Sequence, residues 1–172
     1  MPKPAAIEAN VRTWLRDERQ DTLTAYVRVI TMSLPNAGSS VSGSIAVADL
    51  RVPVEALGRD ISDNCRVTGH ASALAVSPQS FRVLRLGGFK ERVKDIEVEA
   101  TVDGVTVHHL DHTTGSGLRI RYFVIDLPDG RWMADSHVLV KKNGNAAPSA
   151  PASDTFVAAL GTRARPITIA DG

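Results

Sequence analysis

The chain has 172 residues, and its 20 Lys and Arg balance 19 Asp and Glu to give a formal net charge of +1. This length suffices for one domain that buries roughly 70% of its unfolded surface without disulfides or metals. The charge balance excludes a global attraction to nucleic acid or to anionic membranes, and the single cysteine excludes an intrachain disulfide and a multi-thiolate metal site.

The N-terminal segment, residues 1–21, is predicted to be an amphipathic helix. Its apolar side chains recur at helical spacing over residues 5–19: Ile7, Val11, Trp14 and Leu15. The segment reaches Arg12 without a long apolar run, and no window approaches about 18 uncharged apolar residues. We therefore expect the protein in the cytoplasm or within an assembled particle, without membrane contact.

A β domain is predicted over residues 22–142. Its first stretch, TLTAYVRVITMSL, also fits a helical period, but the χ1 stiffness of its β-branched residues favours a strand. Further strand-like runs follow: VSGSIAVADL, RVPVEAL, RVTGHASALAV, SFRVLRL, DIEVEATV, GVTVHHL, GLRIRYFVIDL and RWMADSHVLVKK. The fold class is mainly β, an antiparallel β-sandwich or a small β-barrel, with one N-terminal amphipathic helix and an extended C-terminal arm.

Two turns can be predicted from their residues. Asp103-Gly104 suits a two-residue type I′ turn, which would pair the strands on either side of it as a hairpin. In Leu127-Pro128-Asp129-Gly130, proline fixes φ for the first turn position and glycine supplies a left-handed residue. This second turn should join strands near residues 117–127 and 131–141.

The C-terminal part is predicted to be a linker followed by an arm. Residues 143–154 are small, Pro-containing and poor in apolar side chains, which is typical of a linker. The arm, residues 155–172, carries apolar anchors that would dock into a groove or add a strand to a partner: Phe156, Val157, Leu160, Ile167 and Ile169. The expected partner is another copy of the chain or another protein subunit.

Candidate catalytic and metal-binding groups do not converge in the sequence. In His108-His109-Leu110-Asp111-His112, neighbours on a strand point to opposite faces, so His109 and Asp111 share a face that excludes His108, and a polar strand end is favoured over a metal site. The neighbours Asp135, Ser136 and His137 cannot form a triad by themselves, since they alternate between faces. Cys65 is more typical of an apolar filler than of a nucleophile. We expect no enzyme activity, no metal and no cofactor.

Basic residues concentrate between residues 81 and 94, in FRVLRLGGFKERVK. Five of them form a candidate nucleic-acid contact: Arg82, Arg85, Lys90, Arg92 and Lys94. Phe81 or Phe89 would stack on a base. The alternative is an exposed edge strand whose charges prevent unwanted pairing with other strands.

A short acidic stretch, Asp60-Ile61-Ser62-Asp63-Asn64-Cys65, resembles the DxSxxG motif of PilZ domains in its first half, with Cys65 at the glycine position. Arg12-Thr13-Trp14-Leu15-Arg16 resembles the RxxxR motif of that family. The resemblance implies a six-stranded barrel that binds cyclic di-GMP, with Arg12, Arg16, Asp60 and Ser62 as ligands. Without it, the stretch is a turn whose polar side chains bond to the local backbone.

The function that this sequence favours is a non-catalytic binding or assembly module, such as a structural subunit of a virion or secretion machine. The reasons are the missing catalytic set and the apolar anchors of the predicted arm. A PilZ-like cyclic di-GMP receptor and a nucleic-acid-binding β domain remain as alternatives.

Overall fold

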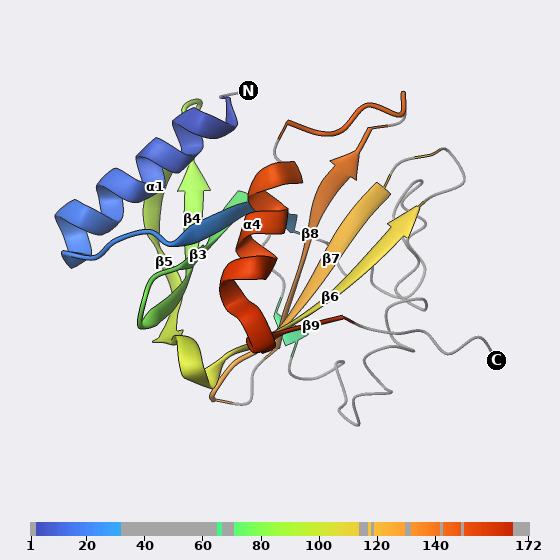
Figure 1. Ribbon diagram of the computed structural model, residues 1–172. Coiled ribbons are helices and arrows are strands. Elements are labelled where there is room, and N and C mark those ends of the chain that lie inside the picture. Colours follow the sequence, from blue (N-terminus) through green and yellow to red (C-terminus); the bar gives the residue numbers. More distant parts are fainter. Residues whose placement is uncertain are drawn as a thin grey trace.

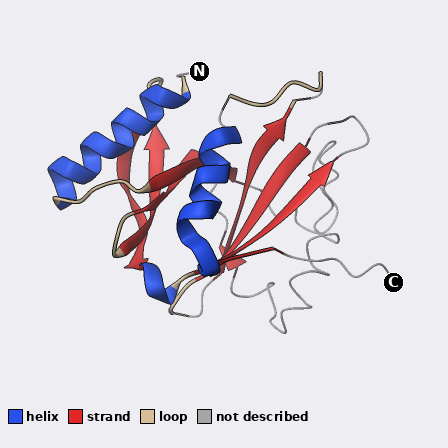
Figure 2. Ribbon diagram, in the orientation of Figure 1, coloured by secondary structure: helices blue, strands red, loops and turns tan. Residues whose placement is uncertain are grey.

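The computed structural model describes residues 3–31, 65–66, 71–113, 117, 119–129, 132–141, 143–148 and 150–166. The helices are α1 (Pro4–Arg19) and α4 (Ala150–Leu160), with single 3₁₀ turns at η1 (Val102–Gly104) and η2 (Gly161–Arg163). The strands are β1 (Ala25–Thr31), β2 (Cys65–Arg66), β3 (Ala71–Val76), β4 (Ser80–Gly87), β5 (Arg92–Thr101), β6 (Thr106–Thr113), β7 (Arg119–Asp126), β8 (Trp132–Val140) and β9 (Ala164–Pro166). The predicted runs VSGSIAVADL and RVPVEAL lie outside these residues. The mainly β fold is confirmed (Figure 2).

The strands form two sheet sections that meet at β1 and β8 (Figure 1). One section is antiparallel, in the order β5-β4-β3-β1, and the other runs β8-β7-β6-β9, with β9 parallel to β6 and β2 parallel to β8. β1 pairs with β8 over only two residues, Ile30 and Thr31. The described strands form no closed barrel, so neither the predicted small barrel nor the PilZ-type barrel is present among them.

Helix α1 covers one face of the antiparallel section, as its apolar stripe predicts. Ile7, Val11 and Leu15 are buried, and Trp14 is half-buried beside them. They pack on the side chains that alternate toward this face of β3 and β4, including Ala73. Small side chains on β3 let the helix approach the sheet closely. The predicted N-terminal helix is confirmed.

Helix α4 fills the opposite, concave face, where it contacts β1, β3 and β8 (Figure 1). Phe156 and Leu160 are completely buried there, and the Phe156 ring meets Phe123 of β7 edge to face, with centroids 5.6 Å apart. The second core therefore contains side chains from both sheet sections and from α4. It holds the two sections together where their backbone pairing is short.

The prediction of an extended C-terminal arm is wrong, because residues 150–160 form α4 and pack on the chain's own sheet. Pro151 lies in the first turn of α4, where backbone N–H groups have no partner within the helix, so a proline there removes no helical hydrogen bond. Ser153, Phe156 and Leu160 then share one buried face. Burial of this face within the domain explains why the segment is a helix.

The predicted hairpin at Asp103-Gly104 is also wrong. These residues lie in η1, which connects β5 to β6, and β5 pairs with β4 while β6 pairs with β7. Val102 is buried and donates its N–H to the Gln79 carbonyl oxygen, so this local packing overrides the turn preference of Asp-Gly. The second prediction is confirmed as far as the strands go, since β7 and β8 pair antiparallel with Asp126 opposite Trp132, while Gly130 of the turn lies outside the described residues.

Candidate binding site at the β4–β5 hairpin

The tip of the β4–β5 hairpin, residues 88–91, presents an apolar ring to solvent. Phe89 is 94% exposed, and no other large hydrophobic side chain among the described residues is exposed. The other three phenylalanines, Phe81, Phe123 and Phe156, are completely buried. Aromatic side chains are enriched in the cores of protein interfaces, so an exposed one on an ordered turn is a candidate contact.

An ion pair beneath the tip fixes its backbone. Arg28 on β1 donates from Nε to both carboxylate oxygens of Glu91, at 3.0 Å each. Their side chains are only 16% and 13% exposed, so water competes little for these bonds. Glu91 has φ of 47°, a left-handed conformation that its bonds to Arg28 help to hold.

Further bonds hold the tip to helix α1 and close the turn. Asn10 donates from Nδ2 to the Lys90 carbonyl oxygen at 3.1 Å, and the Glu91 N–H donates to the Gly88 carbonyl oxygen at 3.1 Å. Gly88 has φ of 77°, which glycine adopts without strain. The tip is thus attached to β1 and to α1, and Phe89 is held in place although it contributes nothing to the core.

Three cations follow Phe89 closely in the chain. Lys90, Arg92 and Lys94 are exposed, and none of them forms an ion pair with a residue that the structure describes. The other two residues of the predicted basic site do not join them. Arg82 is buried, and Arg85 lies with its Nε 3.5 Å from Asp95 Oδ2.

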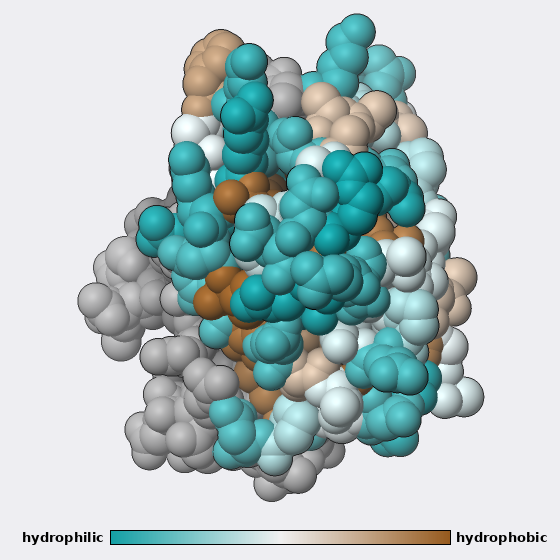
Figure 3. Space-filling model, turned by 90° about the vertical axis from the view of Figure 1, so that its left-hand side faces the viewer, coloured by the Kyte–Doolittle hydropathy of each residue, from teal (hydrophilic) through white to brown (hydrophobic). Residues whose placement is uncertain are grey.

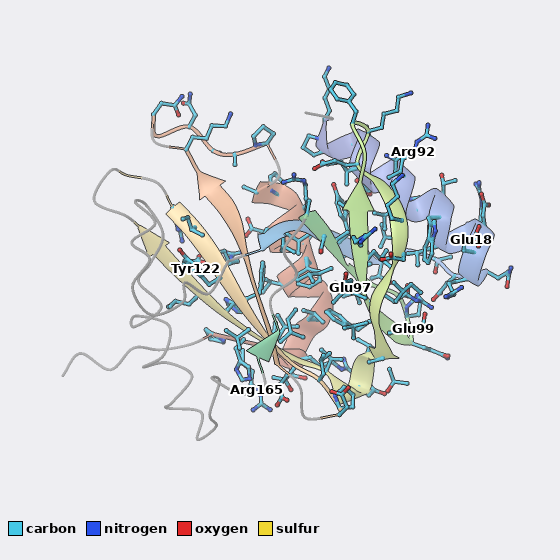
Figure 4. The ribbon with its side chains drawn as sticks, turned by 180° about the vertical axis from the view of Figure 1, so that it is seen from behind. Glu18, Arg92, Glu97, Glu99, Tyr122 and Arg165 are labelled. Carbon is cyan, nitrogen blue, oxygen red and sulfur yellow. The ribbon has the colours of Figure 1, made fainter. Side chains whose placement is uncertain are left out.

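A groove of about 320 Å³ lies beside the tip, between α1 and the start of β5. Its lining combines Trp14 and Val93 with polar and charged groups: Asn10, Thr13, Asp17, Glu18 and Arg92. Figure 4 shows Glu18 and Arg92 on this side of the molecule, from α1 and β5 respectively. The same side is mostly hydrophilic, with small hydrophobic patches (Figure 3). The Arg19 guanidinium lies 5.5 Å from the Trp14 ring centroid and helps to hold the ring.

Arg82 forms a separate, structural cluster. It donates to Glu99 at 2.6 Å, to Asp21 at 2.8 Å and to Ser77 at 3.2 Å. Hydrogen bonds from Arg82 lower the pKa of Glu99 and outweigh the effect of burial. Burial alone would raise the pKa of Asp21, but bonds from Arg82, Thr22 and Ser77 lower it overall. No sequence signal pairs residues so distant in the chain, and the basic residues around Arg82 had suggested an exposed cation.

The predicted pairing of His109 with Asp111 on one face of β6 agrees with the strand register, in which they oppose Phe123 and Arg121. Both carboxylate oxygens of Asp111 accept bonds from Arg121, at 2.7 and 3.1 Å. Burial would raise the pKa of Asp111, yet Arg121 and Arg119 lower it overall. Burial and the Arg121 charge lower the pKa of His109. Arg121 also donates to Ser153 Oγ at 3.0 Å, so the cluster fastens α4 to the β6–β7 hairpin.

The described part of this region brings together no set of metal ligands. Within the part of the chain that the structure describes, no three His, Cys, Asp or Glu side chains are arranged to hold a metal ion. His108 lies on the other face of β6 and is buried. The His112 side chain lies outside the described groups.

The remaining predicted site residues belong to the cyclic di-GMP site and the partner-binding arm. Asp60, Ser62, Ile167 and Ile169 lie outside the described residues. Arg12 and Arg16 project from the exposed side of α1, where they pair with Glu8 at 2.8 Å and Asp17 at 2.9 Å. The predicted partner anchors Phe156 and Leu160 are in the core, and Val157 packs beside them, so these three contact their own domain.

Comparisons with known proteins assign the chain to no family. No protein-family model matches the sequence, and no curated protein matches it either. None of the helices in the described part of the chain combines the length and apolar character needed to cross a bilayer. The function must therefore be inferred from the geometry of the chain itself.

Proposed function

We propose that this protein is a non-catalytic binding or assembly module whose contact surface is the β4–β5 tip. The observation that carries the proposal is Phe89, 94% exposed on a turn that an ion pair and two hydrogen bonds hold in place. Burying an exposed phenylalanine side chain contributes roughly 2–3 kcal/mol to association. Such an aromatic group, surrounded by polar residues, is typical of an interface hot spot.

Preorganisation strengthens this interpretation. A flexible loop loses conformational entropy when it binds, and that loss reduces affinity. Here the bonds of Glu91 and Lys90 to β1 and α1 order the tip before any partner arrives. Lys90, Arg92 and Lys94 would favour a partner with an acidic rim around an apolar pocket.

The polar clusters elsewhere support a binding role over catalysis. The carboxylates of Asp21, Glu99 and Asp111 are each held by an arginine, an arrangement that stabilises the fold and leaves them poor bases. The proposal also fits a subunit of a larger particle, in which many copies of one rigid contact are used.

Site-specific photocrosslinking in the producing organism tests the proposal. A photoreactive phenylalanine analogue replaces Phe89, and the control carries it at Thr162, which is also exposed. We expect a discrete crosslinked product from position 89 only, and its loss when Lys90→Glu and Lys94→Glu are added. Equal labelling at both positions, or none at position 89, would reject the tip as the contact surface.

Single-stranded nucleic acid is a second candidate, because an exposed aromatic ring and Lys90 lie in the turn, Arg92 and Lys94 follow in β5, and none of the three cations has an ion-pair partner among the described residues. With three phosphate contacts, the logarithm of the association constant should fall with a slope of about −2 against the logarithm of salt concentration. Phe89→Ala should lower affinity roughly 10-fold to 100-fold. Flat salt dependence with a labelled oligonucleotide would remove this candidate.

The cyclic di-GMP reading stays a prediction, since two of its four ligands, Asp60 and Ser62, lie outside the described residues. Arg12 and Arg16 would first have to exchange Glu8 and Asp17 for the ligand. Calorimetric titration with cyclic di-GMP would decide it.

A further inference from the structure

We infer that the partner of the β4–β5 tip is a second copy of this chain, with Phe89 of each copy seated in the groove beside Trp14 of the other. The inference rests on the proposed function and adds the identity of the partner. It follows from three properties of the tip and the groove: size, charge and relative position.

The groove has room for the ring. Its volume is about 320 Å³, and a cavity of roughly 150 Å³ is enough to bind benzene. Trp14 and Val93 supply apolar lining, and Trp14 is a half-buried ring that an incoming phenyl group can cover. The groove therefore has more than the volume that a phenyl group needs.

The charges of the two surfaces are complementary. Lys90 lies in the tip and Lys94 follows in β5, while the lining of the groove carries Asp17 and Glu18 against the single cation Arg92. Glu18 makes no side-chain bond to a described residue, whereas Asp17 accepts a bond from Arg16. Lys90 meeting Glu18 across an interface would pair two charges that are otherwise left to solvent.

The relative position of tip and groove suits a twofold axis. Asn10 both lines the groove and bonds to Lys90 of the tip, and Arg92 belongs to the groove and follows the tip directly. In a twofold dimer every contact occurs twice: if residue i of one copy contacts residue j of the other, residue j of the first copy also contacts residue i of the second. Two complementary surfaces on the same side of the molecule can therefore engage each other twice in one closed dimer, whereas surfaces on opposite sides would give rings or filaments.

Charge reversal in a mixture of two variants tests the inference. Lys90→Glu places a carboxylate on the tip opposite Glu18, and Glu18→Lys places a cation in the groove opposite Lys90. Each variant alone should dimerise roughly tenfold more weakly than the wild type, because each repulsion occurs twice. In the mixed dimer both contacts are again between opposite charges. We therefore expect the equimolar mixture to form heterodimers at wild-type affinity, measured by sedimentation equilibrium.

Two further variants separate the interface from general effects of charge and folding. Phe89→Ala should raise the dimer dissociation constant at least about 30-fold without changing stability, because Phe89 contacts no core residue. Lys141→Glu changes an exposed lysine away from the tip and should leave dimerisation unchanged.

The inference is overturned if the mixture associates no better than either variant alone, or if Phe89→Ala dimerises like the wild type. A wild type that stays monomeric at high micromolar concentration would also overturn it. If position 89 then still crosslinks to a different protein, or if oligonucleotide binding depends on Phe89, the tip is a contact surface for another partner. If it crosslinks to nothing, both proposals fail.

Discussion

Arg28 on β1 and Glu91 in the β4–β5 tip form an ion pair that passes over β3, with Arg28 Nε 3.0 Å from each carboxylate oxygen of Glu91. The residue of β3 that pairs with Arg28 is Ala73, whose methyl group leaves space for the long side chains. The position of Phe89 thus depends on a residue in the centre of the sheet.

Breaking this pair should destabilise the fold and the tip together. Glu91→Gln leaves the largely buried Arg28 guanidinium without its counter-charge. We therefore expect the free energy of unfolding, measured in urea, to fall by about 1–3 kcal/mol. Amide hydrogen exchange at residues 88–91 should become faster. Glu8→Gln breaks the exposed pair with Arg12 and is the matched control, expected to cost at most about 0.5 kcal/mol. Equal losses for the two variants would contradict a special role for Glu91.

The Arg82 cluster should make stability depend on acid pH. Asp21 and Glu99 have pKa values below their ordinary values in the folded protein, so they bind protons more readily when unfolded. Their contribution is complete above the unfolded pKa values of about 4 and is lost as pH falls through the lower, folded values. Arg82→Met removes the cause of the shift. The stability difference between wild type and variant should therefore shrink as pH is lowered from neutral into this acid range, and a constant difference would refute the assignment.

Helix α4 should be essential for folding. Phe156 is completely buried against Phe123, so Phe156→Ala should lower the free energy of unfolding by about 3–5 kcal/mol. Thr155→Ala, on the exposed side of α4, should change it by at most about 0.5 kcal/mol. A linker or a docking arm would tolerate both changes equally, and that outcome in urea unfolding would argue against the packed helix.

A close contact between Gly104 and Pro128 should couple the two turns at one end of the sheet. A Cβ added at Gly104 would lie 2.7 Å from Pro128 Cγ, so Gly104→Ala should cost about 1–3 kcal/mol by overpacking. Pro128→Ala removes that ring atom. The double variant should therefore be more stable than the sum of the two single effects predicts, and simple additivity would contradict the contact.

Local sequence patterns predicted those helices and strands whose own residues show a regular pattern. The stripe of Ile7, Val11 and Leu15 located α1, and short runs of strand-forming residues between turn residues located β3 to β8. Helix α4 was missed because small residues and Pro151 resemble a linker. Its available signal was the spacing of Ser153, Phe156 and Leu160 on one helical face.

Long-range contacts were beyond any local pattern. The sequence places Arg82 among other basic residues, and only the fold brings Asp21 and Glu99 to it. Phe81 and Phe89 are equivalent candidates in the sequence, yet one is completely buried and the other 94% exposed. Whether a phenylalanine in a hairpin is core or surface depends on tertiary packing.

Fluorine NMR of the protein labelled with fluorophenylalanine tests the central claim directly, because the chain has only four phenylalanines and only Phe89 is exposed. Phe89→Leu identifies its resonance. When the protein concentration is raised, or when a partner identified by crosslinking is added, we predict that this resonance alone shifts and loses its sensitivity to D₂O. The three core resonances should stay fixed. A Phe89 resonance that remains solvent-exposed in the associated protein would contradict binding through the β4–β5 tip.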